Sequence, residues 1–152
     1  MNKKNLIRLI LTVAIITVFV TSAICVAFSP KKNLKPSEYN LGTTYELAMQ
    51  SKKPFIAVFY SDWCGYCVQS MPKYETLADI YKDKYNFVMV NTDDPALENL
   101  VRSYYIGSLP TIYIVDPTID NRIHITAGIY NDLTLLRVEF DRYLRVRAMI
   151  NK

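Results

Sequence analysis

Several residue types are scarce in this sequence, and each scarcity excludes a class of protein. Three cysteines among 152 residues are too few for a small fold held together by disulfides. Four glycines and seven prolines, against 51% hydrophobic residues, exclude collagen-like, low-complexity and disordered chains. We therefore expect a chain that buries one core of its own, and its length favours a single domain.

Acidic residues are absent before position 38, where six lysines and arginines lie. Residues 38–152 carry 12 basic and 14 acidic side chains, and so a net charge of −2. Binding to nucleic acid requires positive charge gathered on the folded domain. We therefore expect no nucleic acid among the partners of this protein.

An uncharged run of 20 residues, 9–28, is long enough for a helix to cross the hydrocarbon layer of a bilayer. It follows a basic flank, 1–8, and precedes a polar segment, 29–37, whose prolines are typical of an extended linker. The run predicts a transmembrane anchor. The alternative is a secretory signal segment cleaved near Cys25, although the apolar part of such segments is usually only about 7–15 residues long. Lysines and arginines flank the run on both sides, so charge alone leaves its orientation open.

Residues 38–152 alternate between the patterns of strands and of helices. The unbroken apolar run 54–60 is typical of a strand that is covered on both faces. Beyond Cys64, apolar residues recur every three or four positions, which predicts a helix with one buried stripe, kinked at Pro72. We expect further strands at 87–90, 111–115 and 123–126, and further helices at 43–51, 95–105 and from 132 onward. This order predicts an α/β fold with a central mixed sheet flanked by helices.

The motif Trp63-Cys64-Gly65-Tyr66-Cys67 lies where strand 54–60 gives way to the next helix. The unpaired N–H groups and the dipole at a helix N-terminus favour a thiolate, so we expect Cys64 to be a solvent-accessible nucleophile. Cys67 lies one turn further along the helix, within reach of a mixed disulfide between Cys64 and a substrate. We expect Cys67 to resolve that intermediate. Gly65 is expected to leave the approach to Cys64 open, and Trp63 to pack beside Cys64.

Other uses of a cysteine pair fit this sequence less well. Zinc takes about four protein ligands, and outside residues 9–28 the chain offers only these two cysteines and His124. Covalent haem attachment needs a histidine directly after the second cysteine, where Val68 stands. There is no phosphate-binding glycine motif, so we expect neither a metal nor another cofactor. A static disulfide or two inert thiols remain as alternatives to redox chemistry.

Residues 43–150 resemble the thioredoxin family. The resemblance is carried by the apolar strand, the cysteine motif, Pro72 five residues after the second cysteine, and Ser108-Leu109-Pro110-Thr111. It implies a thioredoxin fold and thiol:disulfide exchange, with Trp63, Gly65 and Tyr66 surrounding the catalytic Cys64 and Cys67. It also implies a cis peptide bond before Pro110, which would face the cysteines, and pairing of the Leu109 backbone with an extended substrate peptide. Gly128 falls where the family carries a glycine near the substrate groove.

One position departs from the family. Val58 stands where many thioredoxins carry a buried acid, six residues before the first cysteine, so the usual proton acceptor for Cys67 is missing. Asp62 and Glu75 are near in sequence, but we expect both to be solvated surface charges. Because Tyr66 offers no imidazolium to stabilise a thiolate, we expect an intermediate or reducing potential.

Together these features predict a membrane-tethered disulfide reductase outside the cytoplasm, where substrate disulfides exist. The expected location is the bacterial inner membrane with the domain in the periplasm, or secretion if segment 9–28 is cleaved. Expected partners are proteins that carry disulfides or thiols, with a membrane protein as electron donor. Alternatives are a disulfide oxidase or isomerase of the same fold, and a redox-silent peptide-binding or scaffold module of an envelope assembly.

Overall fold

A computed structural model describes residues 2–5, 11–15 and 34–150 of the chain, which divides into two compact units, Met1–Asn33 and Leu34–Lys152. In the first unit, residues 3–5 and 11–15 are helical, and most of the predicted membrane segment 9–28 lies outside the described residues. Among the residues that are described, no helix combines the length and the apolar character needed to cross a membrane.

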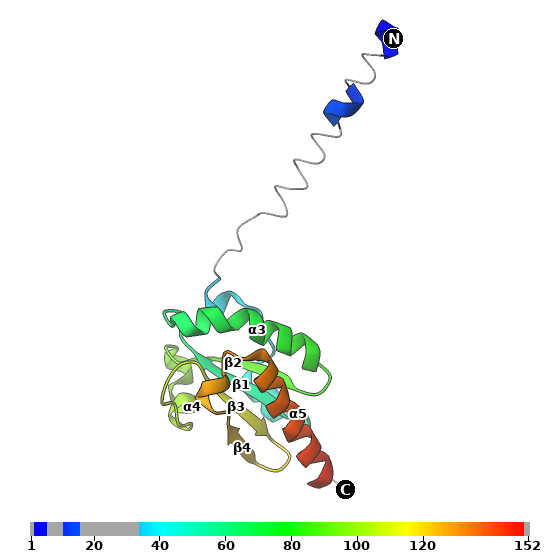
Figure 1. The fold of residues 1–152 in the computed structure, drawn as a ribbon. Coiled ribbons are helices and arrows are strands. Elements are labelled where there is room, and N and C mark those ends of the chain that lie inside the picture. The colour runs from blue at the N-terminus through cyan, green and yellow to red at the C-terminus, as the bar shows by residue number, and fades with distance from the viewer. Residues whose placement is uncertain (1, 6–10, 16–33, 151–152) are drawn as a thin grey trace. The chain divides into compact units, whose positions relative to one another are not determined.

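The second unit is built on a mixed sheet, as predicted. Across residues 34–150 the sheet has four strands in the order β2-β1-β3-β4 (Figure 1). β1 (Phe55–Tyr60) pairs in parallel with β2 (Asn86–Asn91) and antiparallel with β3 (Thr111–Asp116), which pairs antiparallel with β4 (Asn121–His124). Every residue of β1 and β3 is buried, as expected for central strands covered on both faces.

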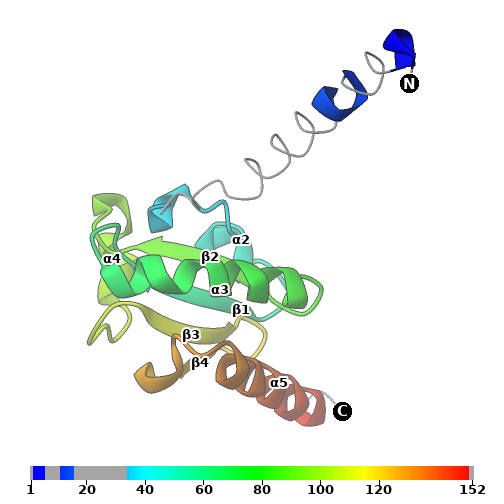
Figure 2. The same cartoon turned by 45° about the horizontal axis from the view of Figure 1, so that its top comes forward.

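Helices cover both faces of this sheet (Figure 2). α3 (Gly65–Tyr81) and α5 (Leu133–Ile150) lie on one face, where their buried side chains form a cluster with Ile56 and Val58 of β1. α2 (Tyr45–Met49) and α4 (Glu98–Arg102) lie on the other face, with Phe55 and Phe59. Three single-turn 3₁₀ helices complete the described secondary structure of this unit: η1 (Pro36–Glu38), η2 (Pro95–Leu97) and η3 (Ala127–Ile129).

Two predicted elements lie elsewhere than expected. The helix predicted over 95–105 begins as η2 behind an Asp94 cap, and α4 ends at Arg102. It ends early because Tyr104 turns inward, with its ring centroid 4.8 Å from that of Phe59. β4 begins two residues before the predicted strand 123–126, because a short turn, with Asp120 at a φ of +47°, already pairs Asn121 with Asp116.

Tyrosine supplies much of the core. All twelve tyrosines lie within the described residues, and eight of them are buried. A buried phenol needs a hydrogen-bond partner, and several of these hydroxyls donate to backbone carbonyls of distant elements. Tyr85, for example, donates to the carbonyl of Phe140 in α5 at 2.8 Å. The tyrosines therefore fasten the elements together as well as filling space.

Candidate active site

The two cysteines lie at the start of α3, as predicted. Cys64 is the N-cap residue, with extended backbone angles (φ −76°, ψ 106°), and the helix begins at Gly65. The N–H of Cys67 donates to Sγ of Cys64 at 3.2 Å, so the sulfur occupies the position that a serine or aspartate oxygen takes in an ordinary cap. The side chain of Cys64 therefore lies against the first turn of α3, and Cys67 belongs to that turn.

The exposure of the motif differs from what we expected. Cys64 is only 6% exposed and Cys67 is fully buried, whereas Trp63 is 75% exposed and Tyr66 is 71% exposed. The expectation that Cys64 is open to solvent was therefore wrong, because its side chain turns back to cap the helix. Trp63, which we expected to pack beside Cys64, has most of its surface exposed to solvent. A side chain at Gly65 would extend into open space.

Burial dominates the chemistry of Cys67. It raises the pKa of the Cys67 thiol to about 12, helped by the hydrogen bond with Cys64 and opposed by the backbone of Ser61. Val58 is fully buried in the same cluster as Cys67, where the family often has an acid. Burial therefore keeps Cys67 a neutral thiol at physiological pH, and Val58 offers no group that could accept its proton.

The two acids that lie near the motif in sequence do not replace it. Glu75 is exposed, as expected. Asp62 is half-buried rather than fully solvated, because its carboxylate accepts hydrogen bonds from the backbone N–H and the hydroxyl of Ser37, at 2.9 and 2.6 Å. The Asp62 carboxylate thus binds Ser37 of η1.

A groove of about 390 Å³ runs beside the motif. Its lining includes Tyr66, from between the two cysteines, together with Leu109, Pro110 and Gly128. The peptide bond between Leu109 and Pro110 is cis. Four residues singled out from the sequence for separate reasons are therefore brought to one concave surface. That surface presents no charged side chain, which suits an apolar or neutral stretch of a partner chain.

Four further residues of the groove were missed in the sequence: Ser70, Ala127, Tyr130 and Asn131. Ser70 is buried in α3, where its hydroxyl donates to the carbonyl of Tyr66 at 2.8 Å. Tyr130 is 5% exposed and Asn131 receives a hydrogen bond from Lys73. Their place shortly after Gly128 was the one signal that could have found Tyr130 and Asn131. Ser70 gave no signal, because a serine does not belong to the apolar pattern that predicted the buried stripe of α3.

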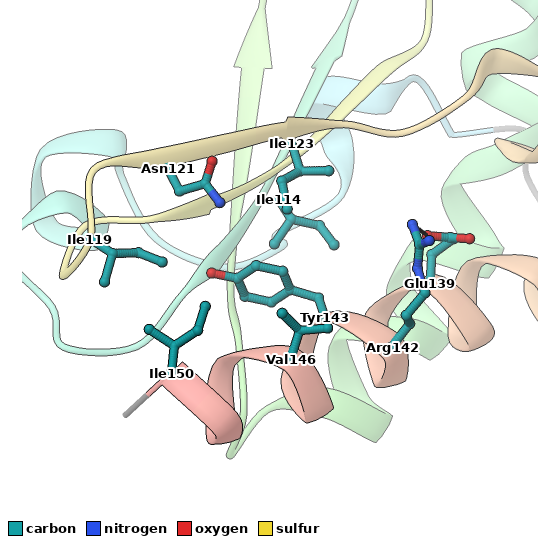
Figure 3. A pocket seen from close by; sticks show the side chains of 9 residues that line it. All are labelled: Ile114, Ile119, Asn121, Ile123, Glu139, Arg142, Tyr143, Val146 and Ile150. Atoms are coloured by element: carbon teal, nitrogen blue, oxygen red, sulfur yellow. Dashed lines mark hydrogen bonds and ion pairs between the residues drawn. The ribbon is translucent and has the colours of Figure 1, made fainter. Parts of the chain in front are cut away.

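A second cavity lies away from the cysteines. Figure 3 shows it between the β3–β4 hairpin and the C-terminal half of α5, with Ile114, Ile119 and Ile123 facing Val146 and Ile150. Its volume is about 140 Å³, and no cysteine or histidine lines it. In the part of the chain that is described, no three histidines, cysteines or carboxylates gather in a way that could hold a metal ion. Within residues 34–150, cysteines are found only at the start of α3.

Comparisons with known proteins agree with this geometry. The sequence profile of the thioredoxin family matches residues 38–142. A protein disulfide-isomerase of Schizosaccharomyces pombe is 36% identical over 67 residues, which cover 44% of this chain and 19% of that protein. The chloroplastic thioredoxin-like protein HCF164 of Arabidopsis thaliana is 35% identical over 72 residues, covering 47% of this chain and 28% of that protein. The chain thus spans less than a third of the length of these relatives.

Solved structures give the same fold. The germline-specific thioredoxin Deadhead of Drosophila melanogaster superposes with a TM-score of 0.55 at 21% identity, over 66% of this chain and 98% of that one. Thioredoxin f of spinach chloroplasts gives 0.53 at 24% identity, over 68% and 90% of the two chains. The profile match covers well over half of the sequence, and the four strands of the sheet and the cysteine pair lie within it. This chain belongs to the thioredoxin family.

Proposed function

We propose that this protein reduces disulfides of protein substrates through Cys64 and Cys67, and that it works outside the cytoplasm on a membrane tether. The observation that carries the proposal is the placement of Cys64 as the N-cap of α3, with its sulfur 3.2 Å from the N–H of Cys67. A helix N-terminus stabilises negative charge on that sulfur. The neighbouring groove offers an extended polypeptide a place to lie.

The proposed reaction has two exchanges. The thiolate of Cys64 attacks one sulfur of the substrate disulfide, forms a mixed disulfide and releases the other substrate sulfur as a thiolate. Cys67 then gives its proton to water and attacks Sγ of Cys64, which releases the second substrate sulfur as a thiolate and leaves a Cys64–Cys67 disulfide. Two electrons pass from the cysteine pair to the substrate. A dithiol donor outside this chain must return them, and we propose a membrane protein in that role.

Reduction of insulin by the purified full-length chain, with dithiothreitol as the electron source, tests the activity. We expect catalysis above the rate of dithiothreitol alone, and no catalysis from Cys64→Ser. Equilibration with glutathione then sets the direction, and we expect an intermediate or reducing potential. A potential at the oxidising end of the scale would overturn the reductase assignment and favour an oxidase.

An isomerase is the second candidate, and two observations favour it. The thiol of Cys67 is buried with a pKa raised to about 12, which slows resolution and prolongs the mixed disulfide. Several relatives are named protein disulfide-isomerase. Recovery of activity from scrambled ribonuclease, in the absence of net reduction, distinguishes the isomerase from the reductase.

The membrane tether is proposed from the uncharged run 9–28. Residues 11–15 of that run are helical, and Leu11, Val13 and Ile15 are each more than half exposed, so their apolar surface is available to lipid. Full-length protein is expected to stay in the membrane fraction after alkaline carbonate extraction. Cys64 is expected to react with a maleimide that cannot cross the inner membrane. Labelling that requires inner-membrane lysis would overturn the extracytoplasmic placement.

A further inference from the structure

Tyr130 lies in the wall of the groove but belongs to none of the motifs that define the family. It follows η3, is 5% exposed, and shares the groove lining with Tyr66 and Pro110. Its side chain is hydrogen-bonded to β4, and its backbone carbonyl to α3, 56 positions earlier in the sequence. These bonds connect the two sides of the groove.

The phenol of Tyr130 lies against β4 and the start of β3. Its hydroxyl is 2.9 Å from Nε2 of His124. Burial raises the pKa of Tyr130, and hydrogen bonding from the backbone of Ile112 and the side chain of Thr111 opposes that rise. Thr111 follows Pro110 directly, and its own hydroxyl donates to the carbonyl of Ser108. The phenol is thus bonded to β4, whose His124 pairs with Tyr113 of β3, the strand that begins directly after the cis-proline loop.

The backbone of Tyr130 is joined to the other side of the groove. Its carbonyl accepts a hydrogen bond of 3.0 Å from the hydroxyl of Tyr74. Tyr74 is almost fully buried in α3, on the same stripe as Cys67 two turns earlier. One residue therefore bridges the helix that carries the cysteines and the loop that carries Pro110.

We infer that Tyr130 is a positioning residue, which holds the Leu109–Pro110 wall in register with α3 so that an extended substrate can lie beside Cys64. The inference rests on the proposed function, because it concerns the binding of the polypeptide substrate. Tyr130 takes no part in the exchange itself. Its hydroxyl matters for substrates that occupy the groove and is irrelevant to disulfides too small to reach it.

The test compares two substrates across matched variants of the full-length chain. Tyr130→Phe removes the hydroxyl and keeps the ring, His124→Ala removes its partner, and His124→Gln keeps a hydrogen-bonding group there. Tyr85→Phe is the control, because it also removes the hydrogen-bonded hydroxyl of a buried tyrosine, in this case one that donates to a backbone carbonyl outside the groove lining. Insulin serves as the polypeptide disulfide and 5,5′-dithiobis(2-nitrobenzoate) as the small one.

For Tyr130→Phe we expect KM for insulin to rise about threefold to tenfold, the range that one lost hydrogen bond supports, with kcat within about twofold of the unsubstituted chain. The rate with the small disulfide should not change. His124→Ala should act in the same direction, His124→Gln less, and Tyr130→Phe with His124→Ala no more than Tyr130→Phe alone.

Three results would overturn the inference while leaving the proposed function intact: a rise in KM no larger than that of Tyr85→Phe, an equal loss with the small disulfide, or additive effects of the two substitutions. Inactivity of the unsubstituted chain toward insulin would overturn the proposed function, and this inference with it.

Discussion

The two ends of the sheet hold their buried polar groups in opposite ways. β1 and β3 run antiparallel, so the end where β1 leads to the cysteines is far from the end where β3 reaches Asp116. At the first end Cys67 is buried among apolar side chains, with Val58 in place of an acid. At the second end Asp116 is fully buried but well satisfied, accepting hydrogen bonds from Thr118, Tyr143 and Arg147.

This difference separates reactivity from stability. A buried charge with several donors anchors the fold, since removing it leaves its partners unpaired. A buried thiol without a charged partner contributes little to stability and remains able to react in thiol–disulfide exchange. Arg147 extends the anchoring end further, because it also donates to the carbonyl of Lys52 at 2.9 Å and so joins α5 to the chain before β1. Substitution of Asp116 should therefore leave the activity per folded molecule unchanged, and substitution of a cysteine should leave the stability unchanged.

The largest expected effect is that of Cys64→Ser on activity. Loss of the nucleophile should lower the rate of insulin reduction on the order of a thousandfold or more, because no other described cysteine can form the mixed disulfide with substrate and be resolved. Urea unfolding followed by circular dichroism should give a midpoint close to that of the unsubstituted chain. A variant that keeps more than a tenth of the activity would contradict the assigned role of Cys64.

Asp116→Ala should have the opposite profile. It leaves Arg147 and Tyr143 without their buried partner, so the free energy of unfolding should fall by about 3–5 kcal/mol. Activity per folded molecule should be unchanged, as measured by insulin reduction at a temperature where the variant is still folded. A loss below about 1 kcal/mol would show that the network is not an anchor.

The same carboxylate makes stability depend on pH. Burial alone would raise the pKa of Asp116, but hydrogen bonds from Arg147, Thr118 and Tyr143 outweigh it and hold the pKa below its ordinary value. A folded pKa below the unfolded value means that the stabilisation is present above about pH 4 and is lost as pH falls through the folded pKa. Unfolding midpoints of Asp116→Ala and the unsubstituted chain should therefore converge as the solution is acidified below pH 4.

A smaller, graded effect is expected at the other end, in the resolution of the mixed disulfide. Burial, the main cause of the raised pKa of Cys67, persists in that intermediate, so the fraction of Cys67 thiolate should rise about tenfold for each pH unit between 6 and 9. To measure the rate of resolution, a mixed disulfide is formed between Cys64 and a cysteine-containing peptide, and its decay is followed by rapid quenching. Cys67→Ala should accumulate the intermediate at every pH, and a rate that levels off below pH 8 would reveal a base near Cys67.

The smallest effect is expected from a charge pair that belongs to neither end. Arg102 and Glu98 on α4 lie 2.6 Å apart, but both side chains are more than half exposed. Glu98→Gln should change the free energy of unfolding by less than about 0.5 kcal/mol and leave activity unaltered, as measured by urea denaturation and insulin reduction. A larger loss would mean that surface charges, and not only Asp116, stabilise this fold.

The active-site end was largely predictable from the sequence, whereas the anchoring end was not. An apolar run over 54–60, a cysteine pair at the start of a helix and a proline before 111 are local signals, and each predicted element formed. Tyr143 and Arg147 reach Asp116 across 27 and 31 positions, and Arg147 reaches Lys52 across 95, and no local pattern marks such contacts. Exposure at the motif was also missed, because the cap that turns Cys64 inward depends on backbone angles that spacing does not reveal.

The exposure of Trp63 has a practical consequence. It is the one tryptophan in the chain, and it stands directly before the nucleophilic cysteine. Excitation at the red edge of the absorption band selects the indole over the twelve phenols, so emission comes from a single site next to the sulfur. Sulfur oxidation, or the arrival of a polypeptide in the groove, can thus be followed in real time without an attached dye.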